Sequence, residues 1–201
     1  MMDGLARARP DVPPRDAGGR ADARQRILDA AERIVQAKGV PALTLDAAAK
    51  EAGVSKGGLL YHFASKEALL TGLLNRMAAF IEADFERVLA AQPDHPARAA
   101  RAVLAWTFDH PEEVCQQHER AAAVFLAAFH QDPALLGPIR AVFARIRDRL
   151  RQDTLPPGRA LAVMAACDGL FMASLFDMYE LGAEERDALR DALRQLVGEG
   201  A

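Results

Sequence analysis

The feature that most constrains the fold of this chain is a pair of short predicted helices separated by only three residues. Thr44 and Ser55 carry hydroxyl groups that accept hydrogen bonds from the free N–H groups at a helix start, and Gly53 lies where the first helix must end. A glycine also permits the tight turn that two nearly perpendicular helices need. The sequence therefore predicts helices over 45–52 and 56–62, arranged as a helix-turn-helix.

A longer helix is expected on each side of this motif. Apolar residues recur every three or four positions from Ala23 to Lys38, and Gly39 ends that helix. Ser65 begins a fourth helix, which keeps its helical period to about Ala91. This pattern predicts a three-helix domain followed by a long connecting helix.

The second short helix has an unusual first turn, Lys56-Gly57-Gly58. Two glycines inside a helix cost roughly 1 kcal/mol each relative to alanine, and close approach of the backbone to a DNA groove would offset that cost. The alternative is that these glycines form a loop and that residues 61–63 form an ordinary core edge. Hydroxyl, imidazole and ammonium groups donate to phosphate oxygens, so the first interpretation predicts phosphate contacts from Tyr61, His62 and Lys66.

The rest of the chain is also predicted to be helical. Alanine, leucine and arginine are abundant, and no strand-like alternation of apolar and polar residues occurs. Residues 1–22 lack periodicity and are expected to form a disordered tail. The expected domains are 23–68, which contains the helix-turn-helix at about 44–63, and 69–201. Beyond the fourth helix, proline, glycine and aspartate punctuate helices predicted over about 96–109, 112–131, 134–152, 157–178 and 184–197.

Charge is distributed unevenly between the two parts of the chain. Residues 1–76 hold 12 Lys and Arg against 9 Asp and Glu, a balance of +3, whereas residues 77–201 hold 13 against 19, a balance of −6. A basic first part joined to an acidic second part is typical of a DNA-contacting domain linked to one that stays off DNA.

Several other classes of protein are not indicated. The chain has no nucleotide-binding, serine-hydrolase or zinc-protease motif, so neither an enzyme nor a cofactor is predicted. The group Asp109, His110, Cys115 and His118 matches no strong metal-ligand spacing, and no metal is expected. Neither a secretory signal nor a membrane span is evident, which favours a cytoplasmic protein.

Residues 23–81 resemble the TetR family of bacterial regulators. The resemblance is carried by RQRILDAAERIVQAKG and by LTLDAAAKEAGVSKGGLLYHFASKEALL, which contains the triplet Tyr61-His62-Phe63. It implies an all-α fold of nine or ten helices, with an N-terminal DNA-binding domain and a C-terminal effector-binding and dimerisation domain. Carried over residue by residue, it implies phosphate contacts from Thr44, Ser55, Tyr61, His62 and Lys66, and close approach to bases by Lys56, Gly57 and Gly58.

The resemblance also implies a function, which is to bind a palindromic operator as a homodimer and to be released by a small-molecule effector. Two protomers would pair through the last two long helices, with candidate interface residues Gly169, Met172, Phe176, Leu189 and Leu193. Aromatic and methionine side chains can line an apolar effector pocket or fill a solid core. The candidate pocket residues are Trp106, Phe125, Phe129, His130, Met164, Asp168 and Phe171.

Asp168 lies in an apolar stretch, where a buried acid must be paired or must meet a ligand. An acidic, aromatic-containing domain would suit a lipophilic cation as effector. Two other functions remain open: a transcriptional activator of the same fold, and a helical ligand-binding or adaptor module without a role on DNA.

Overall fold

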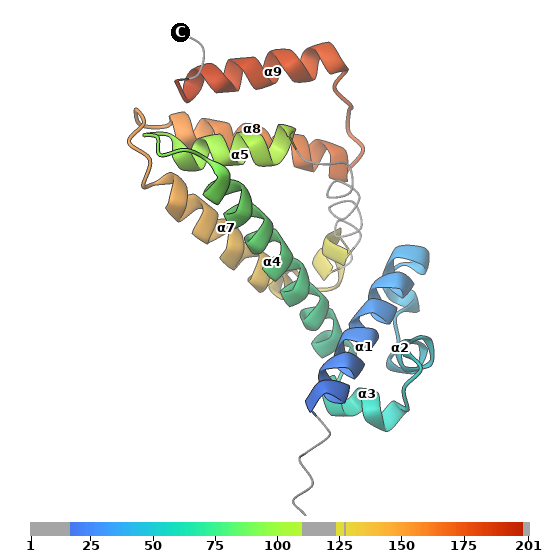
Figure 1. Ribbon diagram of the computed structural model, residues 1–201. Helices are drawn as coiled ribbons and strands as arrows, with labels where there is room; N and C mark the ends of the chain where they lie inside the picture. The colour runs from blue at the N-terminus through green and yellow to red at the C-terminus, as the bar shows by residue number, and fades with distance from the viewer. Residues whose placement is uncertain (1–16, 110–123, 127, 199–201) are drawn as a thin grey trace, which may run out of the picture.

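The computed structural model describes residues 17–109, 124–126 and 128–198, and the regular structure in these ranges is entirely helical. The first three helices, α1 (Ala17–Lys38), α2 (Leu45–Ala52) and α3 (Lys56–His62), pack together at one end of the molecule and are called the head (Figure 1). A short 3-10 helix, η1 (Val40–Ala42), connects α1 to α2. This arrangement confirms the predicted three-helix domain.

The core of the head is formed by the apolar faces of its helices. Ile27 and Leu28 of α1, Leu43 before α2, and Leu59 of α3 are almost completely buried. Burial of a leucine or isoleucine side chain contributes about 1.5–3 kcal/mol, and the head supplements this with a hydrogen-bonded cap at each short helix. Helices of seven or eight residues are marginal alone in water, so this packing is what holds α2 and α3 in place.

Helix α4 (Lys66–Ala91) leaves the head and runs into the other half of the molecule (Figure 1). Its N-terminal half contributes Leu69 and Leu70 to the core, and Gly72 lies against the head. Its C-terminal half contributes Phe85 and Val88 to the core, beside α5 (Arg98–Phe108) and α7 (Gly137–Leu150). The long helix is therefore the physical link between the head and the rest of the chain.

The remaining helices form a second unit, called the body. They are α5 (Arg98–Phe108), η2 (Pro133–Leu136), α7 (Gly137–Leu150), α8 (Arg159–Leu175) and α9 (Ala183–Leu196). Helix α7 lies along α4, α5 lies beside α8, and α9 is at the end farthest from the head (Figure 1). Within the described ranges, no helix is long and apolar enough to cross a membrane.

Most predicted helices match the structure, with two differences. Helix α1 begins at Ala17, so the expected tail of residues 1–22 is helical over its last six residues, and its earlier part lies outside the described residues. The tail prediction was wrong over 17–22 because it rested on the lack of apolar periodicity, whereas these residues extend the periodic helix without a break. The predicted helix 112–131 falls mostly outside the described residues, with helical structure at 124–126 and 128–131.

Candidate functional site

Two hydroxyl side chains fix the geometry of the helix-turn-helix. Thr44 Oγ1 accepts a hydrogen bond from the Ala47 N–H at 3.0 Å, and Ser55 Oγ accepts one from the Gly58 N–H at 3.0 Å. Gly53 adopts a left-handed conformation with φ 64° and ends α2, as predicted. These local bonds set where α3 starts and how it leaves α2. Since the caps use one N–H of each helix start, other N–H groups in the first turn remain able to donate to an anion.

Helix α3 presents one buried and one open face. Leu59 is completely buried and Phe63, directly after the helix, is 4 % exposed, whereas Tyr61 is 70 % exposed. Gly57 and Gly58 are both exposed and lie within the helix, not in a loop. An added Cβ at Gly57 would meet nothing within 4 Å, so the protein leaves space beside this turn in which another molecule could approach the backbone.

The tyrosine and the histidine of this face contact each other. The Tyr61 and His62 rings lie edge to face, with centroids 5.1 Å apart. Tyr61 is solvent-facing and His62 is partly buried. The alternative interpretation, in which residues 61–63 form an ordinary core edge, therefore holds for Phe63 but not for Tyr61.

Both lysines near α3 have partners inside the head. Lys56 Nζ lies 3.0 Å from Asp46 Oδ1 in an exposed ion pair. Lys66 Nζ donates to the Val40 carbonyl oxygen at 2.8 Å and ties the start of α4 to η1. An ammonium has three donors, so Lys66 keeps two for another acceptor. Lys56 would have to give up its ion pair with Asp46 to contact a phosphate or a base.

The start of α4 is polar and favours negative charge. Ser65 Oγ accepts a hydrogen bond from the Ala68 N–H at 3.1 Å. The backbone N–H of Glu67 and the Ser65 side chain hold the pKa of the Glu67 carboxyl below its usual range. This helix end is thus an electropositive point on the same part of the head as Lys66.

Sequence patterns did not indicate the contact that fixes the head to α4. Arg76 of α4 forks between Asp29 and Glu32, which lie one turn apart on α1, and forms an ion pair with each. Arg76 is only 24 % exposed, so solvent screens these pairs less than it would on an open surface. Two carboxylates at i and i+3 could have suggested a cation partner, but nothing in the sequence identifies which one.

A buried carboxylate joins α4 to α5, and this group was also missed. Asp84 is 6 % exposed; its Oδ2 accepts a hydrogen bond from Trp106 Nε1 at 2.8 Å, and its Oδ1 pairs with Arg87 at 2.6 Å. The Trp106 ring also packs edge to face against Phe85, with centroids 5.8 Å apart. Because both oxygens of Asp84 are engaged, its charge is compensated within the protein.

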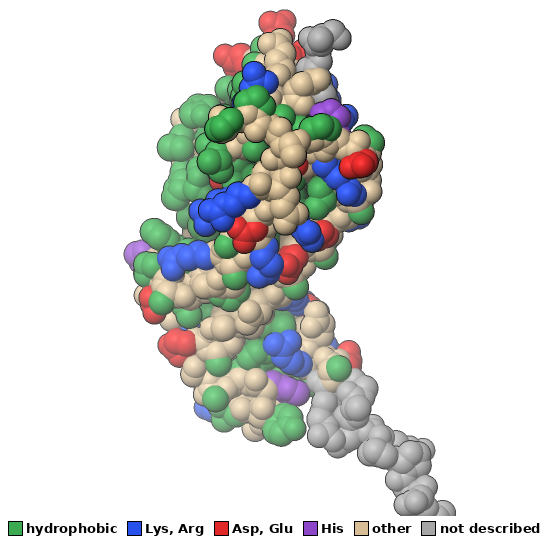
Figure 2. Space-filling model, turned by 90° about the vertical axis from the view of Figure 1, so that its left-hand side faces the viewer, with side chains coloured by type: hydrophobic (Ala, Val, Ile, Leu, Met, Phe, Trp, Pro, Cys, Tyr) green, Lys and Arg blue, Asp and Glu red, His purple; other side chains and the backbone are tan. Residues whose placement is uncertain are grey.

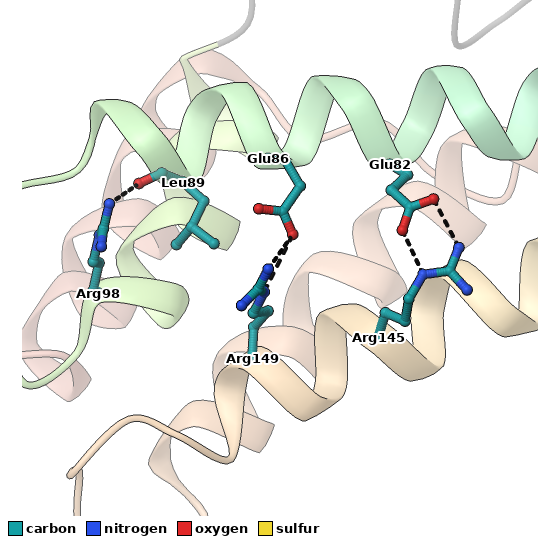
Figure 3. A network of polar contacts seen from close by, with 6 residues as sticks. All are labelled: Glu82, Glu86, Leu89, Arg98, Arg145 and Arg149. Atoms are coloured by element: carbon teal, nitrogen blue, oxygen red, sulfur yellow. Dashed lines mark hydrogen bonds and ion pairs between the residues drawn. The ribbon is translucent and has the colours of Figure 1, made fainter.

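Two ion pairs in a ladder join α4 to α7 (Figure 3). Glu82 pairs with Arg145 through two hydrogen bonds, and Glu86 pairs with Arg149 at 3.1 Å. The Arg145 guanidinium holds the pKa of the Glu82 carboxyl below its usual range. The ladder spacing of four residues on both helices shows that α4 and α7 run in the same direction here.

The candidate pocket residues occupy two kinds of environment. Trp106, Phe125 and Met164 are partly buried and pack against the core, whereas Phe129 and Phe171 are 51 % and 40 % exposed. His130 is also exposed. Asp168 is partly buried, and burial raises the pKa of its carboxyl. Of the group Asp109, His110, Cys115 and His118, in which the sequence predicts no metal site, the last three lie outside the described residues.

The candidate dimer residues likewise divide. Gly169 and Phe176 of the α8 region are exposed, and Met172 is partly exposed. Leu193 is 6 % exposed and Leu189 is partly buried against the core, so both contribute to packing within the protomer. A role for Leu189 and Leu193 in the dimer interface stays a prediction. Hydrophobic side chains gather at the surface of the upper body, the end of the molecule that holds α8 and α9 (Figure 2). The large exposed apolar residues of that region are Leu161, Phe171, Phe176, Met178 and Tyr179.

Two family models together cover most of the chain. The model described as bacterial regulatory proteins, tetR family, matches residues 27–73, and the model described as tetracyclin repressor-like, C-terminal domain, matches residues 97–198. The first contains the helix-turn-helix, and the second contains the body from α5 to α9.

Individual proteins give the same picture. The chain is 28% identical over 162 residues to the HTH-type transcriptional regulator BetI of Burkholderia pseudomallei, with 77% of this chain and 83% of that protein covered. It is 42% identical over 64 residues to the uncharacterized HTH-type transcriptional regulator TtgW of Pseudomonas putida, a match that spans 48% of that protein and 32% of this chain. Among solved structures, the multidrug binding protein EbrR complexed with malachite green is similar over 87% of this chain and 97% of that chain, with 30% identity and a TM-score of 0.60.

Proposed function

Because the chain belongs to the TetR family and is thereby a helix-turn-helix transcriptional regulator, we propose that it is a homodimeric repressor that a lipophilic small molecule releases from a palindromic operator. The observation that carries the proposal is the open face of α3, where two exposed glycines and a 70 % exposed tyrosine follow a capped helix start. A protein of this function acts in the cytoplasm, where bacterial DNA lies, and its work includes no catalytic step.

We assign the phosphate contacts to the predicted residues Thr44, Ser55, Tyr61, His62 and Lys66. Tyr61 supports this assignment by its exposure, and Lys66 by its two remaining donors at the positive end of α4. Lys56, Gly57 and Gly58 form the first turn of α3 and would enter the major groove, where the absence of side chains at the glycines allows the backbone to approach the bases. Two such helices in a dimer would read half-sites about 34–36 Å apart.

Substitution at these contacts tests the DNA-binding assignment. Tyr61→Phe and Lys66→Ala are each expected to weaken operator binding, and Lys66→Ala is expected to reduce the dependence of affinity on salt by about one phosphate contact. Arg147→Gln, an exposed arginine on α7, is the control and should leave both quantities unchanged. Fluorescence anisotropy at several salt concentrations gives affinity and slope together. Unchanged values in both head variants would remove these residues from the DNA-contact set.

The exposed apolar surface of α8 supports the homodimer. Leu161, Gly169, Met172 and Phe176 lie along the helix at spacings of three, four or eight residues, and Gly169 would allow a second helix to approach closely. A contiguous exposed apolar patch of this kind is typical of an interaction site. Phe176→Glu is expected to convert the dimer to a monomer in analytical ultracentrifugation, and a dimer that persists would place the interface elsewhere.

The negative charge of the second part of the chain supports a lipophilic cation as effector. Residues 77–201 carry a balance of −6, and Asp168 has no ion-pair partner among the described residues. The similar protein EbrR has been crystallised with malachite green, ethidium and proflavin, which are aromatic cations. A carboxylate that is costly to bury alone would be stabilised by such a cation.

Dye titration tests the effector. Trp106 is the only tryptophan of the chain, so its fluorescence reports on the α4–α5 contact alone. We expect malachite green to quench this fluorescence in a saturable way and to release bound operator, and we expect Asp168→Asn to weaken both effects. Glu180→Gln, an exposed acid beyond α8, is the control. A response that is absent, or equal in Asp168→Asn and the control, would contradict a cation held by Asp168.

The coupling between effector and DNA follows from α4. A ligand that binds the body better in one arrangement of α4 shifts the population toward that arrangement, and the head follows because Arg76 ties it to the same helix. The released state would then hold its two heads at a spacing that no longer matches successive half-sites. Scattering or spin-label distances should differ between the DNA-bound and dye-bound dimers, and equal distances would refute this coupling.

A further inference from the structure

A cleft of about 500 Å³ opens at the end of the body farthest along α4 from the head. Its walls are the last turn of α4, the segment before α5, the first turn of α5, and the end of α7. Leu89, Pro96 and Ala99 form its apolar part, and the polar rim includes His95, Arg98 and Thr154. This location is separate from α3 and from the group around Asp168 on α8.

Arg98 and Arg149 both lie near this end of α4, and among the described residues only Arg149 has an ion-pair partner (Figure 3). Arg149 is neutralised by Glu86, which accepts both its Nε and Nη2 hydrogens at 3.2 and 3.1 Å. Arg98 donates only to the Leu89 carbonyl oxygen, at 3.2 Å, and forms no ion pair with any described residue. Its Nε is shielded from solvent and has no hydrogen-bond partner in the described structure. Because Nε is out of reach of solvent, an anion in the cleft would pair with the Nη end of the Arg98 guanidinium, whose positive charge no described acid compensates.

The other polar groups of the cleft are consistent with an anion. His95 Nδ1 accepts the Ala97 N–H at 3.0 Å, so the neutral ring carries its proton on Nε2 and can donate. Asp153, the carboxylate nearest the start of α5, is already engaged, because its two oxygens accept the Ala99 and Ala100 N–H groups at 3.0 and 2.8 Å. The start of α5 is therefore satisfied within the protein, and Arg98 is the group that remains available.

We propose that this cleft binds a small organic anion whose carboxylate or phosphate group pairs with Arg98. The two Nη groups of a guanidinium carry paired N–H donors that match either group, and Leu89, Pro96 and Ala99 provide apolar surface for a short carbon skeleton. Such a ligand would bridge α4, α5 and α7 at the far end of the connecting helix. The site is distinct from the effector site proposed above and does not depend on it.

Thermal unfolding with two probe anions tests the proposal. Citrate supplies carboxylates and inorganic phosphate supplies the other group, each titrated at constant ionic strength against potassium chloride. A ligand at ten times its Kd is expected to raise the Tm of the wild-type chain by roughly 3–5 °C. A rise in Tm with only one probe identifies the group, carboxylate or phosphate, that the cleft prefers. A rise with both probes shows that the cleft recognises either anion.

Three variants separate a site at Arg98 from general effects. Arg98→Gln should lose the shift, Arg147→Gln on the exposed side of α7 should keep it, and Asp94→Asn, which removes an exposed carboxylate at the rim, should tighten binding by up to about fivefold. The Tm of each variant without added anion shows whether that variant folds. If Arg98→Gln does not fold, Asp94→Asn still tests the site, because its binding should be tighter than that of the wild type. Citrate and phosphate also stabilise proteins by exclusion from their surfaces. An equal shift in all four proteins would show exclusion only and overturn the proposal, as would the absence of any shift.

Discussion

At the scale of single residues, Gly72 shows how closely the head approaches α4. A Cβ added at this position would lie 2.7 Å from Phe63 Cε1 and 3.1 Å from Leu28 Cδ2. Both neighbours belong to the core of the head, where side chains have little room to move. The glycine is therefore what lets α4 pass against the residues directly after α3 and against α1.

Gly72→Ala is expected to destabilise the protein, because overpacking of this kind costs about 1–3 kcal/mol while the gain in helix propensity is about 1 kcal/mol. Urea unfolding measures the difference. Gly137→Ala is the matched control, since it lies in the first turn of α7 with nothing within 4 Å of its added Cβ. An alanine at 72 that is as well tolerated as one at 137 would show that the head is not packed against α4 as described.

Asp168 makes stability depend on pH in a direction opposite to that of most acids. Burial raises the pKa of its carboxyl, so the folded state binds the proton more tightly than the unfolded state, where an aspartate titrates near 3.9. Its stabilising contribution is therefore complete below that value and is lost as the pH rises through the folded-state pKa.

Asp168→Asn removes the buried charge and should raise the Tm at pH 7. The gain should shrink as the pH falls toward 4, because the wild-type carboxyl is then protonated as well. Thermal unfolding from pH 4 to pH 8 measures this difference, with Glu180→Gln as an exposed control. A Tm difference that is constant over this range, or that grows at low pH, would contradict the assignment of burial as the cause.

At the scale of elements, the contact between α1 and α4 decides whether the head moves as one piece with the long helix. Arg76 holds Asp29 and Glu32 together, and without it the two carboxylates would repel each other. Arg76→Gln is expected to cost about 1 kcal/mol, since the pairs are partly exposed, and to speed hydrogen exchange along α1 more than in the body.

Arg33→Gln is the control for that variant. Arg33 pairs with Glu51 at 3.2 Å between α1 and α2, and both side chains are about half exposed. Exposed pairs of this kind contribute little, so its effect should stay within about 0.5 kcal/mol. If Arg76→Gln changed neither the stability nor the hydrogen exchange of α1, the ion pairs of Arg76 with Asp29 and Glu32 would have no part in coupling the head to the body.

Elements whose signals are local could be predicted from the sequence, and contacts made across the chain could not. Thr44, Gly53 and Ser55 act within a few residues of themselves, so α2 and α3 begin and end where the sequence indicated. Asp84 and Trp106 are 22 residues apart and lie on different helices, and no pattern in either helix indicates the partner. The faces of α8 and α9 fall between these cases, since their period was evident but the side that packs inward depends on α5.

At the scale of the whole molecule, charge and exposed apolar surface are distributed differently over the two parts of the chain. Residues 1–76 carry the basic balance and include the open face of α3, whereas residues 77–201 carry the acidic balance and include the apolar surface of α8. Helix α4 is fixed to the head by Arg76, to α5 by Asp84, and to α7 by the ion-pair ladder. Under the proposed function, these three contacts along one helix are the route by which an effector bound in the body would change the position of the head.

The central claim is that this chain, as a dimer, binds particular DNA sequences. The most direct test is to select bound fragments from sheared genomic DNA of the source bacterium, and to titrate the purified protein against a selected fragment and a random duplex at several salt concentrations. We predict a shared palindromic sequence in the selected fragments, two protomers for each site, and an affinity at physiological salt at least about 10³-fold above that for the random duplex. Equal affinity for both duplexes at every salt concentration, with no sequence enriched, would contradict the account.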